Sequence, residues 1–293
     1  MKKGTKMAAL MLAMAMMTTA LTACGGDAKS SSTATDTTVT DSQPQDSAPA
    51  DTEPAEAGTQ EAAPEAGGTL TFGTNAEFPP FEFVTGSGVI DQYDGIDIAI
   101  AKQIAEKNDM TPAIENMEFA SLLVALQNGQ IDAAIAGMTV TDERKEEADF
   151  SIPYYTATQV MIVKEDSDIT SAADMADKKI CVIEGYTGEI CVKDMGYPYE
   201  AFKKGTDAIM ELVNGKCDVV VLDSATSQKY ISDNEGLKIV EDPSAFESEE
   251  YAIAVKKGNT ELLDMINTAI DAMLTDGTVA ELGAKYTEEL SAE

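Results

Sequence analysis

The sequence predicts a mixed α/β fold whose sheet is largely parallel. Two patterns alternate along residues 68–293: short apolar runs such as TLTFG and CDVVVLD, and longer stretches in which apolar residues recur every three or four positions. The first pattern is typical of buried strands and the second of helices that pack on one face. This part of the 293-residue chain is long enough for one large or two small hydrophobic cores.

The segment 69–155 is expected to contain three strands and, before the helix that carries Arg144, two helices. Ile96, Ile100 and Ile104 lie at steps of four in GIDIAIAKQIAEKN, which places them on one face of a helix. The leucines of FASLLVALQ mark the face of a second helix in the same way. The expected strands are 69–73, 113–118 and 131–137.

The rest of the chain continues the alternation. TATQVMIVKED predicts a long strand, and Ser171 and Asp174 then stand at nearly the spacing of a capping box, which predicts a helix start. A helix with Met210, Leu212 and Val213 is expected between KICVIE and CDVVVLD. The further expected strands are 156–166, 179–184, 217–223 and 251–255, and the expected C-terminal helices run through 262–274 and 279–286.

The N-terminus has the form of an export signal with a lipid-attachment site. Lys2, Lys3 and Lys6 precede an apolar run that is short for a transmembrane helix, and the run ends in Leu-Thr-Ala-Cys at Cys24. Small residues before a cysteine match a lipobox, in which the nucleophilic thiol takes the lipid. We therefore expect a lipoprotein signal peptide over 1–23 and lipidation at Cys24. An ordinary secretory signal with an incidental cysteine is the alternative.

Residues 24–67 are expected to be a disordered acidic tether. They contain no aromatic residue and almost no branched apolar residue, so they cannot bury enough surface to offset the entropy of ordering. Acidic residues and prolines favour an extended chain. A long tether on a lipidated cysteine suits a protein held on the outer face of the cytoplasmic membrane, and we expect a Gram-positive source.

Composition excludes several classes of function. The chain has 52 acidic and 20 basic residues, so its surface repels nucleic-acid backbones. It has no histidine, the usual general base and zinc ligand, and we expect neither a metal nor a cofactor. Cys181, Cys191 and Cys217 remain beyond the lipid site. Whether any two of them are bonded is left open, and buried free thiols are at least as well supported.

Arg144 is electrostatically out of place in GMTVTDERKEEADFS. Thr141 is a good N-cap and acidic residues follow it, whereas a cation is disfavoured in the first turn of a helix. An exposed ion pair with Glu143, Glu147 or Asp149 is the simpler interpretation. However, Arg144 follows the end of a strand, where open α/β sheets bind ligands, and its guanidinium offers a planar fork to a carboxylate.

Other expected loops carry features that point to the same kind of site. NAEFPPFEF leaves a strand with two prolines and three phenylalanines, and Phe119 begins a helix directly after another strand. GYTGE follows a strand and opens a helix, so its N–H groups can bind an anion, although it lacks the ending of a phosphate loop. Asp223 ends a run of valines, where a carboxylate is the natural partner of an ammonium group.

Taken in order, these stretches resemble family 3 of the extracellular solute-binding proteins, the polar amino-acid receptors of ABC importers. The resemblance covers essentially all of 69–286 and is strongest in FASLLVALQNGQIDAAIAGMTVTDERKEEADFSIPYY. It implies a two-lobed periplasmic-binding-protein fold of type II (a Venus flytrap) with two hinge strands and a ligand in the cleft. Lobe 1 would comprise 69–155 plus 252–293, and lobe 2 would comprise 159–246.

The resemblance also assigns roles to single residues. Arg144 would clamp the α-carboxylate of an amino acid, helped by Thr139. Asp223 would pair with the α-ammonium group, alongside the Gly137 carbonyl. Further N–H groups for the carboxylate would come from the backbone near Thr187 and Gly188.

The ligand side chain would lie between Phe78 and Phe119, and Asn75 and Glu184 would contact its far end. Receptors for cationic side chains commonly have aspartate where Asn75 stands, and some relatives have histidine where Leu222 stands. A neutral Asn75 argues against a strictly basic ligand, and Glu184 argues against an acidic one. We expect a polar uncharged amino acid, with a cationic one next.

The resemblance implies a binding protein and not an enzyme. We expect a monomer that works with permease and ATPase subunits on separate chains, because the sequence ends just beyond the last expected helix and leaves no room for the output domain of a sensor. A dehydratase acting on arogenate-like acids has the same fold and is the alternative. Glu184 or Glu77 would then supply the acid for the leaving hydroxyl.

Overall fold

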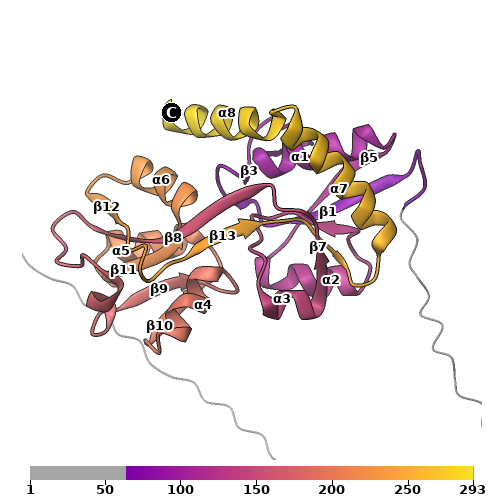
Figure 1. The fold of residues 1–293 in the computed structure, drawn as a ribbon. Helices are drawn as coiled ribbons and strands as arrows, with labels where there is room; N and C mark the ends of the chain where they lie inside the picture. Colours follow the sequence, from indigo (N-terminus) through magenta and orange to yellow (C-terminus); the bar gives the residue numbers. More distant parts are fainter. Residues whose placement is uncertain (1–63, 293) are drawn as a thin grey trace, which may run out of the picture. The chain divides into compact units, whose positions relative to one another are not determined.

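The computed structural model describes residues 64–292, whose course is shown in Figure 1. The expected signal peptide at 1–23, the lipid site at Cys24 and all but the last residues of the tether at 24–67 lie outside the described residues and stay predictions. Within 64–292, no helix combines the length and the apolar character needed to span a membrane.

The first sheet contains five strands: β1 (Thr69–Thr74), β5 (Thr111–Asn116), β6 (Ala133–Ala134), β7 (Ala148–Phe150) and β14 (Ala254–Lys256). Their order is β5-β1-β6-β14-β7. β1 is parallel to β5 and β6, whereas β14 is antiparallel to β6 and β7. The register sets Phe72 opposite Ala133, and both side chains are fully buried.

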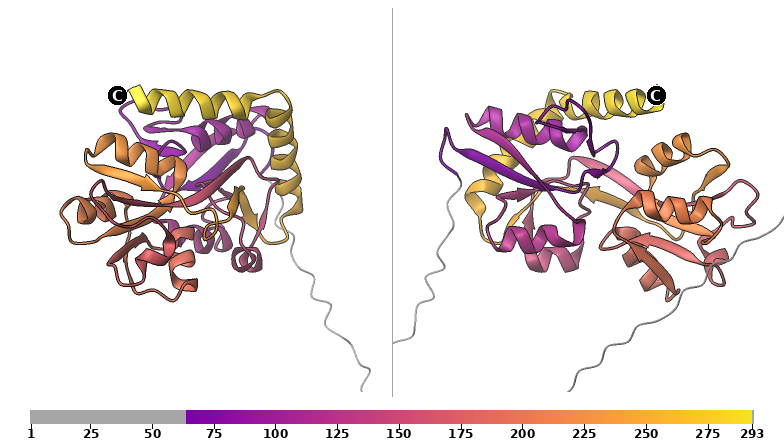
Figure 2. Two further views of the ribbon diagram at one scale, coloured as in Figure 1. Left: turned by 60° about the vertical axis from the view of Figure 1, so that its left-hand side comes forward. Right: turned by 180° about the vertical axis from the view of Figure 1, so that it is seen from behind.

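Helices cover both faces of this sheet, as Figures 1 and 2 show. Ile96, Ile100 and Ile104 are buried, as their spacing predicted, and their helix contacts the two C-terminal helices. We call this sheet and its helices the first lobe. The helices on one face are α1 (Ile96–Lys107), α7 (Thr260–Thr275) and α8 (Thr278–Ala292), and those on the other are α2 (Leu122–Gln127) and α3 (Asp142–Glu147).

The second sheet contains β8 (Tyr155–Lys164), β9 (Ile180–Ile183), β10 (Tyr199–Phe202), β11 (Val219–Asp223) and β12 (Leu237–Val240). Their order is β10-β9-β11-β8-β12. β9 is parallel to β10 and β11, and β8 is antiparallel to β11 and β12. We call this sheet the second lobe, with its helices α4 (Thr187–Asp194), α5 (Gly205–Val213) and α6 (Ser224–Asp233).

Two strands run side by side between the lobes (Figure 1). The first half of β8 pairs with β13 (Ser248–Tyr251), with Tyr155 opposite Tyr251 and Thr158 opposite Ser248. The second half of β8 pairs with β11 and β12. One continuous strand therefore belongs to both the connection and the second lobe. A small sheet of β2 (Glu77–Phe78), β3 (Glu82–Val84) and β4 (Tyr93–Asp94) lies between β1 and α1 in the chain.

Two expected strands differ from the structure. The strand expected at 131–137 is limited to β6, which pairs with β14 over two residues before the chain turns at Gly137, whose φ is 54°. The strand expected at 251–255 divides into β13 and β14. It divides because the N–H of Ala252 donates to the Met138 carbonyl, so the chain changes its pairing partner between the two strands.

Two helix faces also differ from the apolar residues that marked them. In α5, Leu212 is buried but Met210 and Val213 are 48% and 37% exposed. In α7, the buried face ends at Met273, and Leu274 is 42% exposed. Apolar residues adjacent in sequence point in different directions on a helix, so only some members of each cluster reach the core.

The three cysteines of the described residues are free. Cys181 and Cys217 are buried and Cys191 is half-buried. Cys181 lies on β9 and Cys217 just precedes β11, its neighbour in the sheet. The two buried thiols act as small apolar side chains in the second lobe.

Candidate functional site

A small cavity between the lobes collects most of the predicted site residues. The space left open in it is about 10 Å³, which is close to that of a single water molecule. Of the ten residues that the resemblance assigned to the ligand, only Asn75, Glu184 and Gly188 do not line it. The lining residues are Phe78, Phe119, Ala136, Gly137, Thr139, Arg144, Tyr186, Thr187 and Asp223.

Arg144 is buried at the N-terminus of α3, with a side chain only 7% exposed. The Thr141 hydroxyl accepts from its backbone N–H and caps the helix. The guanidinium donates from Nη1 to the Thr139 carbonyl (2.7 Å) and from Nη2 to the Gly185 carbonyl of the second lobe (2.9 Å). Its carbon lies 5.1 Å from the centre of the Phe119 ring, close enough for a cation–π contact. The simpler interpretation, an exposed ion pair, is therefore wrong.

Burial disfavours the charged form of Arg144 and lowers the pKa of its guanidinium, whereas the nearby carboxylates of Glu249 and Asp223 raise it. Arginine nevertheless stays protonated in proteins. The cavity thus contains a permanent, largely desolvated cation, and neutral carbonyl groups accept the hydrogen bonds from its Nη1 and Nη2. A carboxylate would be a stronger acceptor for the same donors.

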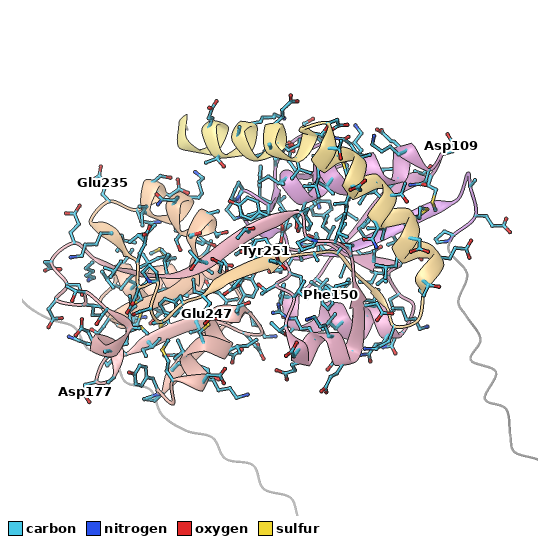
Figure 3. The ribbon with its side chains drawn as sticks, viewed as in Figure 1. Asp109, Phe150, Asp177, Glu235, Glu247 and Tyr251 are labelled. Atoms are coloured by element: carbon cyan, nitrogen blue, oxygen red, sulfur yellow. The ribbon has the colours of Figure 1, made fainter. Side chains whose placement is uncertain are left out.

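Asp223 supplies the opposite charge from the second lobe. It ends β11 and directly precedes α6, and it is 3% exposed. Burial raises the pKa of its carboxyl group, against hydrogen bonds from Tyr251 and Gln159 that lower it. The Tyr251 hydroxyl donates to it from β13, which Figure 3 shows in the connection between the lobes. Asp223 is thus linked directly to one of the connecting strands.

An aromatic ring from the second lobe lies between the two predicted phenylalanines. The Tyr186 ring is 5.4 Å from Phe78, edge to face, and 4.7 Å from Phe119. Its hydroxyl donates to Oδ1 of Asn75 (2.7 Å), whose Nδ2 donates to the Met117 carbonyl (2.8 Å). In this structure Tyr186 therefore occupies the position expected for the ligand side chain and fixes the Asn75 amide.

Glu184 and Gly188 lie outside the cavity. Glu184 is exposed to solvent, away from the residues that line it. Gly188 is buried where α4 approaches β11, and a Cβ there would lie 2.6 Å from the Val221 carbonyl oxygen. Glycine is needed at that point because the helix start packs directly on strand backbone. The proposed contact of Glu184 with a ligand stays a prediction.

Asp97 and Glu82 form a buried pair of carboxyl groups next to Gly137, and only their apolar surroundings in the sequence hinted at it. Asp97 Oδ2 accepts from the Gly137 N–H (2.7 Å) and from the Tyr154 hydroxyl (2.8 Å). Burial raises the pKa of Asp97 to about 6, and burial together with Asp97 raises that of Glu82 well above its usual value. Burial and the neighbouring Asp97 carboxylate therefore favour the protonated form of Glu82, and Asp97 fixes the glycine whose carbonyl was predicted to face the ammonium group.

A second acid of the cleft was also missed. Glu249 on β13 accepts from the Thr139 hydroxyl (2.7 Å) and from the Gln159 amide (3.4 Å). The Thr187 hydroxyl lies 2.9 Å from that of Thr139. Residues 138–140 and 250–252 are joined by backbone hydrogen bonds, which explains why Glu249 lies against Thr139 although the two are far apart in sequence.

Exposed ion pairs join the lobes at the rim of the cleft. Lys203 Nζ lies 2.7 and 2.8 Å from the two carboxylate oxygens of Glu118, and Lys204 Nζ lies 2.7 Å from Glu77. Tyr230 adds a hydrogen bond to the Glu77 carbonyl (3.3 Å). These contacts, with those of Arg144 and Tyr186, hold the cleft closed in this structure.

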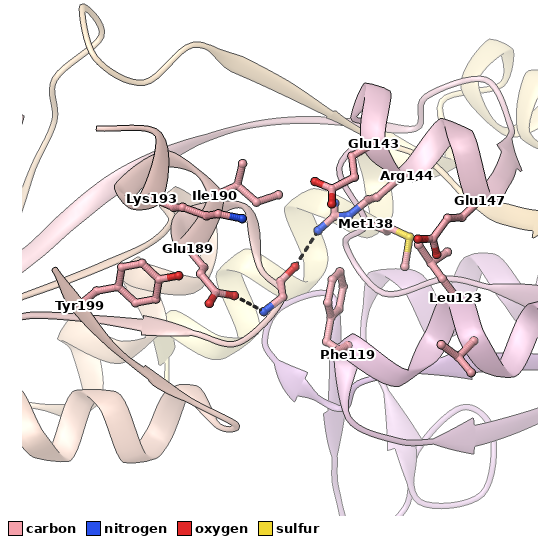
Figure 4. A pocket seen from close by; sticks show the side chains of 13 residues that line it. Phe119, Leu123, Met138, Glu143, Arg144, Glu147, Glu189, Ile190, Lys193 and Tyr199 are labelled. Atoms are coloured by element: carbon pink, nitrogen blue, oxygen red, sulfur yellow. Dashed lines mark hydrogen bonds between the residues drawn. The ribbon is translucent and has the colours of Figure 1, made fainter. Parts of the chain in front are cut away.

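A larger hollow of about 370 Å³ adjoins the cavity on the outer side of Arg144 (Figure 4). Arg144 and Phe119 line both spaces and form the wall between them, and Figure 4 shows the hydrogen bond from Arg144 to Gly185 across it. The hollow also carries Glu143, Glu147 and Glu189. Among residues 64–292, no group of three or more acidic or cysteine side chains is arranged to hold a metal ion.

This chain is similar to known proteins in sequence and in structure. The model of the bacterial extracellular solute-binding proteins, family 3, matches residues 70–289. A probable histidine-binding protein of Neisseria gonorrhoeae is 33% identical over 73% of this chain and 81% of its own length. The arginine-binding extracellular protein ArtP of Bacillus subtilis is 31% identical over 74% of this chain and 85% of its own. A solved structure described as an ancestral arginine-binding protein bound to glutamine is 42% identical, with a TM-score of 0.69, over 74% of this chain and 97% of that one.

Proposed function

The chain belongs to family 3 of the bacterial extracellular solute-binding proteins, and from this premise we propose that it captures a free amino acid between its lobes and delivers it to the permease of an ABC importer. Membership also confirms the expected two-lobed, type II periplasmic-binding-protein fold. The relatives are named for binding amino acids, which supports binding over catalysis.

The observation that carries the proposal is a pair of opposite charges in one cavity. Arg144 comes from the first lobe and Asp223 from the second, and both are almost fully buried. An amino acid is a zwitterion, so its carboxylate matches the guanidinium fork and its ammonium group matches the carboxylate. Low effective dielectric in a closed cleft strengthens both pairs.

The two charges already contact groups that a ligand can replace. Arg144 donates to the carbonyls of Thr139 and Gly185, and Asp223 accepts from the Tyr251 hydroxyl. A ligand carboxylate takes over the donors of Arg144, and a ligand ammonium group becomes a donor to Asp223. Because the cavity now has space only for about one water molecule, the lobes separate before an amino acid enters.

The ligand side chain displaces Tyr186 from its place between Phe78 and Phe119 and meets Asn75. The neutral Asn75 amide donates and accepts, which suits a polar uncharged side chain, and a cationic side chain is second. Relatives named for histidine, arginine and glutamine binding support this range.

Delivery requires attachment and partners. Lipidation at Cys24 and the tether at 24–67 would hold the protein on the outer face of the cytoplasmic membrane of a Gram-positive cell. Permease and ATPase subunits would be separate chains, and the binding protein would act as a monomer. An extracytoplasmic location is supported by the family itself.

A thermal-shift screen of the purified protein against all twenty amino acids tests the proposal. A ligand that binds the folded state at a concentration 100-fold above its Kd stabilises it by about 2.7 kcal/mol, which shifts the melting temperature by several degrees. We expect the largest shifts with polar uncharged and cationic amino acids. Absence of any shift, or formation of an aromatic product from arogenate or prephenate, would contradict the proposal.

A further inference from the structure

Glu249 contacts the predicted carboxylate-binding residues but has no role in the zwitterion clamp. It lies half-buried on β13, and its Oε2 accepts from the Thr139 hydroxyl at 2.7 Å. Thr139 in turn lies 2.9 Å from the Thr187 hydroxyl, and its carbonyl accepts from Arg144. Glu249 is thus the last acceptor in a short row of hydrogen bonds that runs from the Thr187 hydroxyl of the second lobe through the Thr139 hydroxyl.

The number of available protons determines which hydroxyl group donates in each of these hydrogen bonds. An ionised carboxylate only accepts, so the single hydroxyl proton of Thr139 points to Glu249. Thr139 then has only lone pairs left for Thr187, so the Thr187 proton points to Thr139. While Glu249 is ionised, both hydroxyl protons are committed within the protein. A ligand carboxylate, which also only accepts, would find no hydroxyl donor here.

Glu249 faces several other charged or titratable groups. Asp223 and Arg144 act on it through space with opposite signs, and Thr139 and Gln159 are hydrogen-bonded to it. Tyr251 and Cys191 also feel its charge. Burial is the largest influence and, with Asp223, raises the pKa of Glu249 to about 7. Small changes in its surroundings therefore alter its charge at neutral pH.

We propose that Glu249 couples amino-acid binding to the uptake of one proton, because it holds the hydroxyl proton that the ligand carboxylate needs. The proposal rests on the proposed function of the cleft. When the carboxylate binds at Arg144 and Thr139, Glu249 takes a proton from the solvent buffer. Its new O–H donates to the Thr139 oxygen, and the Thr139 O–H turns to the ligand. Glu249 is a positioning residue that acts through Thr139.

Isothermal titration calorimetry measures this proton directly. We would titrate the whole protein with L-glutamine and with L-arginine, whose side chains do not titrate between about pH 6 and about pH 8.5. In buffers of different ionisation enthalpy, the slope of the observed heat against that enthalpy gives the number of protons taken up. We expect uptake approaching one proton near pH 7.5, and a Kd that rises with pH by up to about tenfold per unit.

Glu249→Gln is the decisive variant, since its neutral amide can donate to Thr139 as the protonated acid does. We expect this variant to take up fewer protons than the wild type and to lose most of the pH dependence of Kd. Glu250→Gln is the matched control, because Glu250 is the next residue on β13 but is exposed to solvent. We expect it to behave like the wild type. A proton released by Asp223 contributes equally to the wild type and to Glu250→Gln, in which both Asp223 and Glu249 are retained.

The outcomes separate this inference from the proposed function. If neither amino acid binds the wild type, both the proposed ligand class and the inference fail. If the wild type and Glu249→Gln both bind and take up equal numbers of protons, the inference alone is overturned. If Glu249→Gln does not bind either amino acid, the measurements on the wild type test the inference. A wild-type Kd that does not change with pH, together with binding heats that do not depend on the buffer, overturns the coupling.

Discussion

Replacing Arg144 by alanine removes both arms of the fork that is proposed to hold the ligand carboxylate. In the present structure these arms donate to the carbonyls of Thr139 and Gly185, at 2.7 and 2.9 Å. The guanidinium also lies against the Phe119 ring. The perturbation therefore deletes one buried charge, two donors and one wall of the cavity, and leaves the remaining lining in place.

The magnitude follows from the number of bonds. Hydrogen bonds to charged groups contribute roughly 1.5–3 kcal/mol each, so two of them correspond to roughly 3–6 kcal/mol of binding free energy. At about 1.4 kcal/mol per factor of ten, Kd should rise by roughly 10²- to 10⁴-fold. Arg144→Lys keeps the charge but offers no planar fork, and we expect an intermediate loss.

Calorimetry with the amino acid that gives the largest thermal shift provides the measurement. Lys145→Ala is the control, because Lys145 is the next residue on α3 but its side chain is 55% exposed and forms an ion pair with Asp142 on the same helix. We expect wild-type affinity for Lys145→Ala. A Kd unchanged in Arg144→Ala, with a wild-type melting temperature, would refute the assignment of Arg144 to the ligand.

Three further changes test other parts of the structure. Replacing Lys203 and Lys204 together by alanine removes the exposed ion pairs across the cleft. We expect ligand dissociation, measured by stopped flow, to accelerate by about two- to fivefold at low salt. A difference between variant and wild type that persists in 1 M salt would contradict an ionic cause. Glu82→Gln tests the buried carboxyl pair. The pKa of Glu82 is raised in the folded state, so the contribution of this carboxyl group to stability is full below its ordinary pKa and is lost as pH rises. The melting temperature of the wild type should therefore fall more between about pH 5 and about pH 8 than that of the variant. Gly188→Ala brings a Cβ to 2.6 Å from the Val221 carbonyl oxygen and should destabilise the fold by about 1–3 kcal/mol. Gly283 lies on α8, where a Cβ would meet nothing within 4 Å, so Gly283→Ala should stabilise the fold by about 0.5–1 kcal/mol. Chemical denaturation measures both changes.

Local periodicity could predict the regular elements but not their ends. Ile96, Ile100 and Ile104 identified α1 because their spacing matches the helical repeat and needs no distant partner. β6 is short because only Ala133 and Ala134 pair with β14, which comes from far along the chain. α6 was not predicted at all, since SATSQKYISD has few apolar residues to mark a face.

Single residues of the site were predictable only where they conflicted with their local surroundings. Arg144 was noticeable in the first turn of an acidic helix, yet the sequence alone favoured an exposed ion pair, because burial depends on the approach of the second lobe. Tyr186 and Glu249 gave no comparable signal. Each lies near the cavity only because segments distant in sequence meet there, at Asn75 and at Thr139.

The position of β14 has a consequence for the order of folding. This strand comes from residues 254–256 yet lies between β6 and β7 in the first sheet, and α7 and α8 follow it in the chain. The first lobe therefore stays incomplete until residues 254–256 join it, whereas the strands β8 to β12 of the second lobe follow one another in the chain. Contacts so distant in sequence form slowly, and the open edge of β6 is exposed to other chains in the meantime. Late completion of the first lobe is thus a step at which partly folded chains can aggregate.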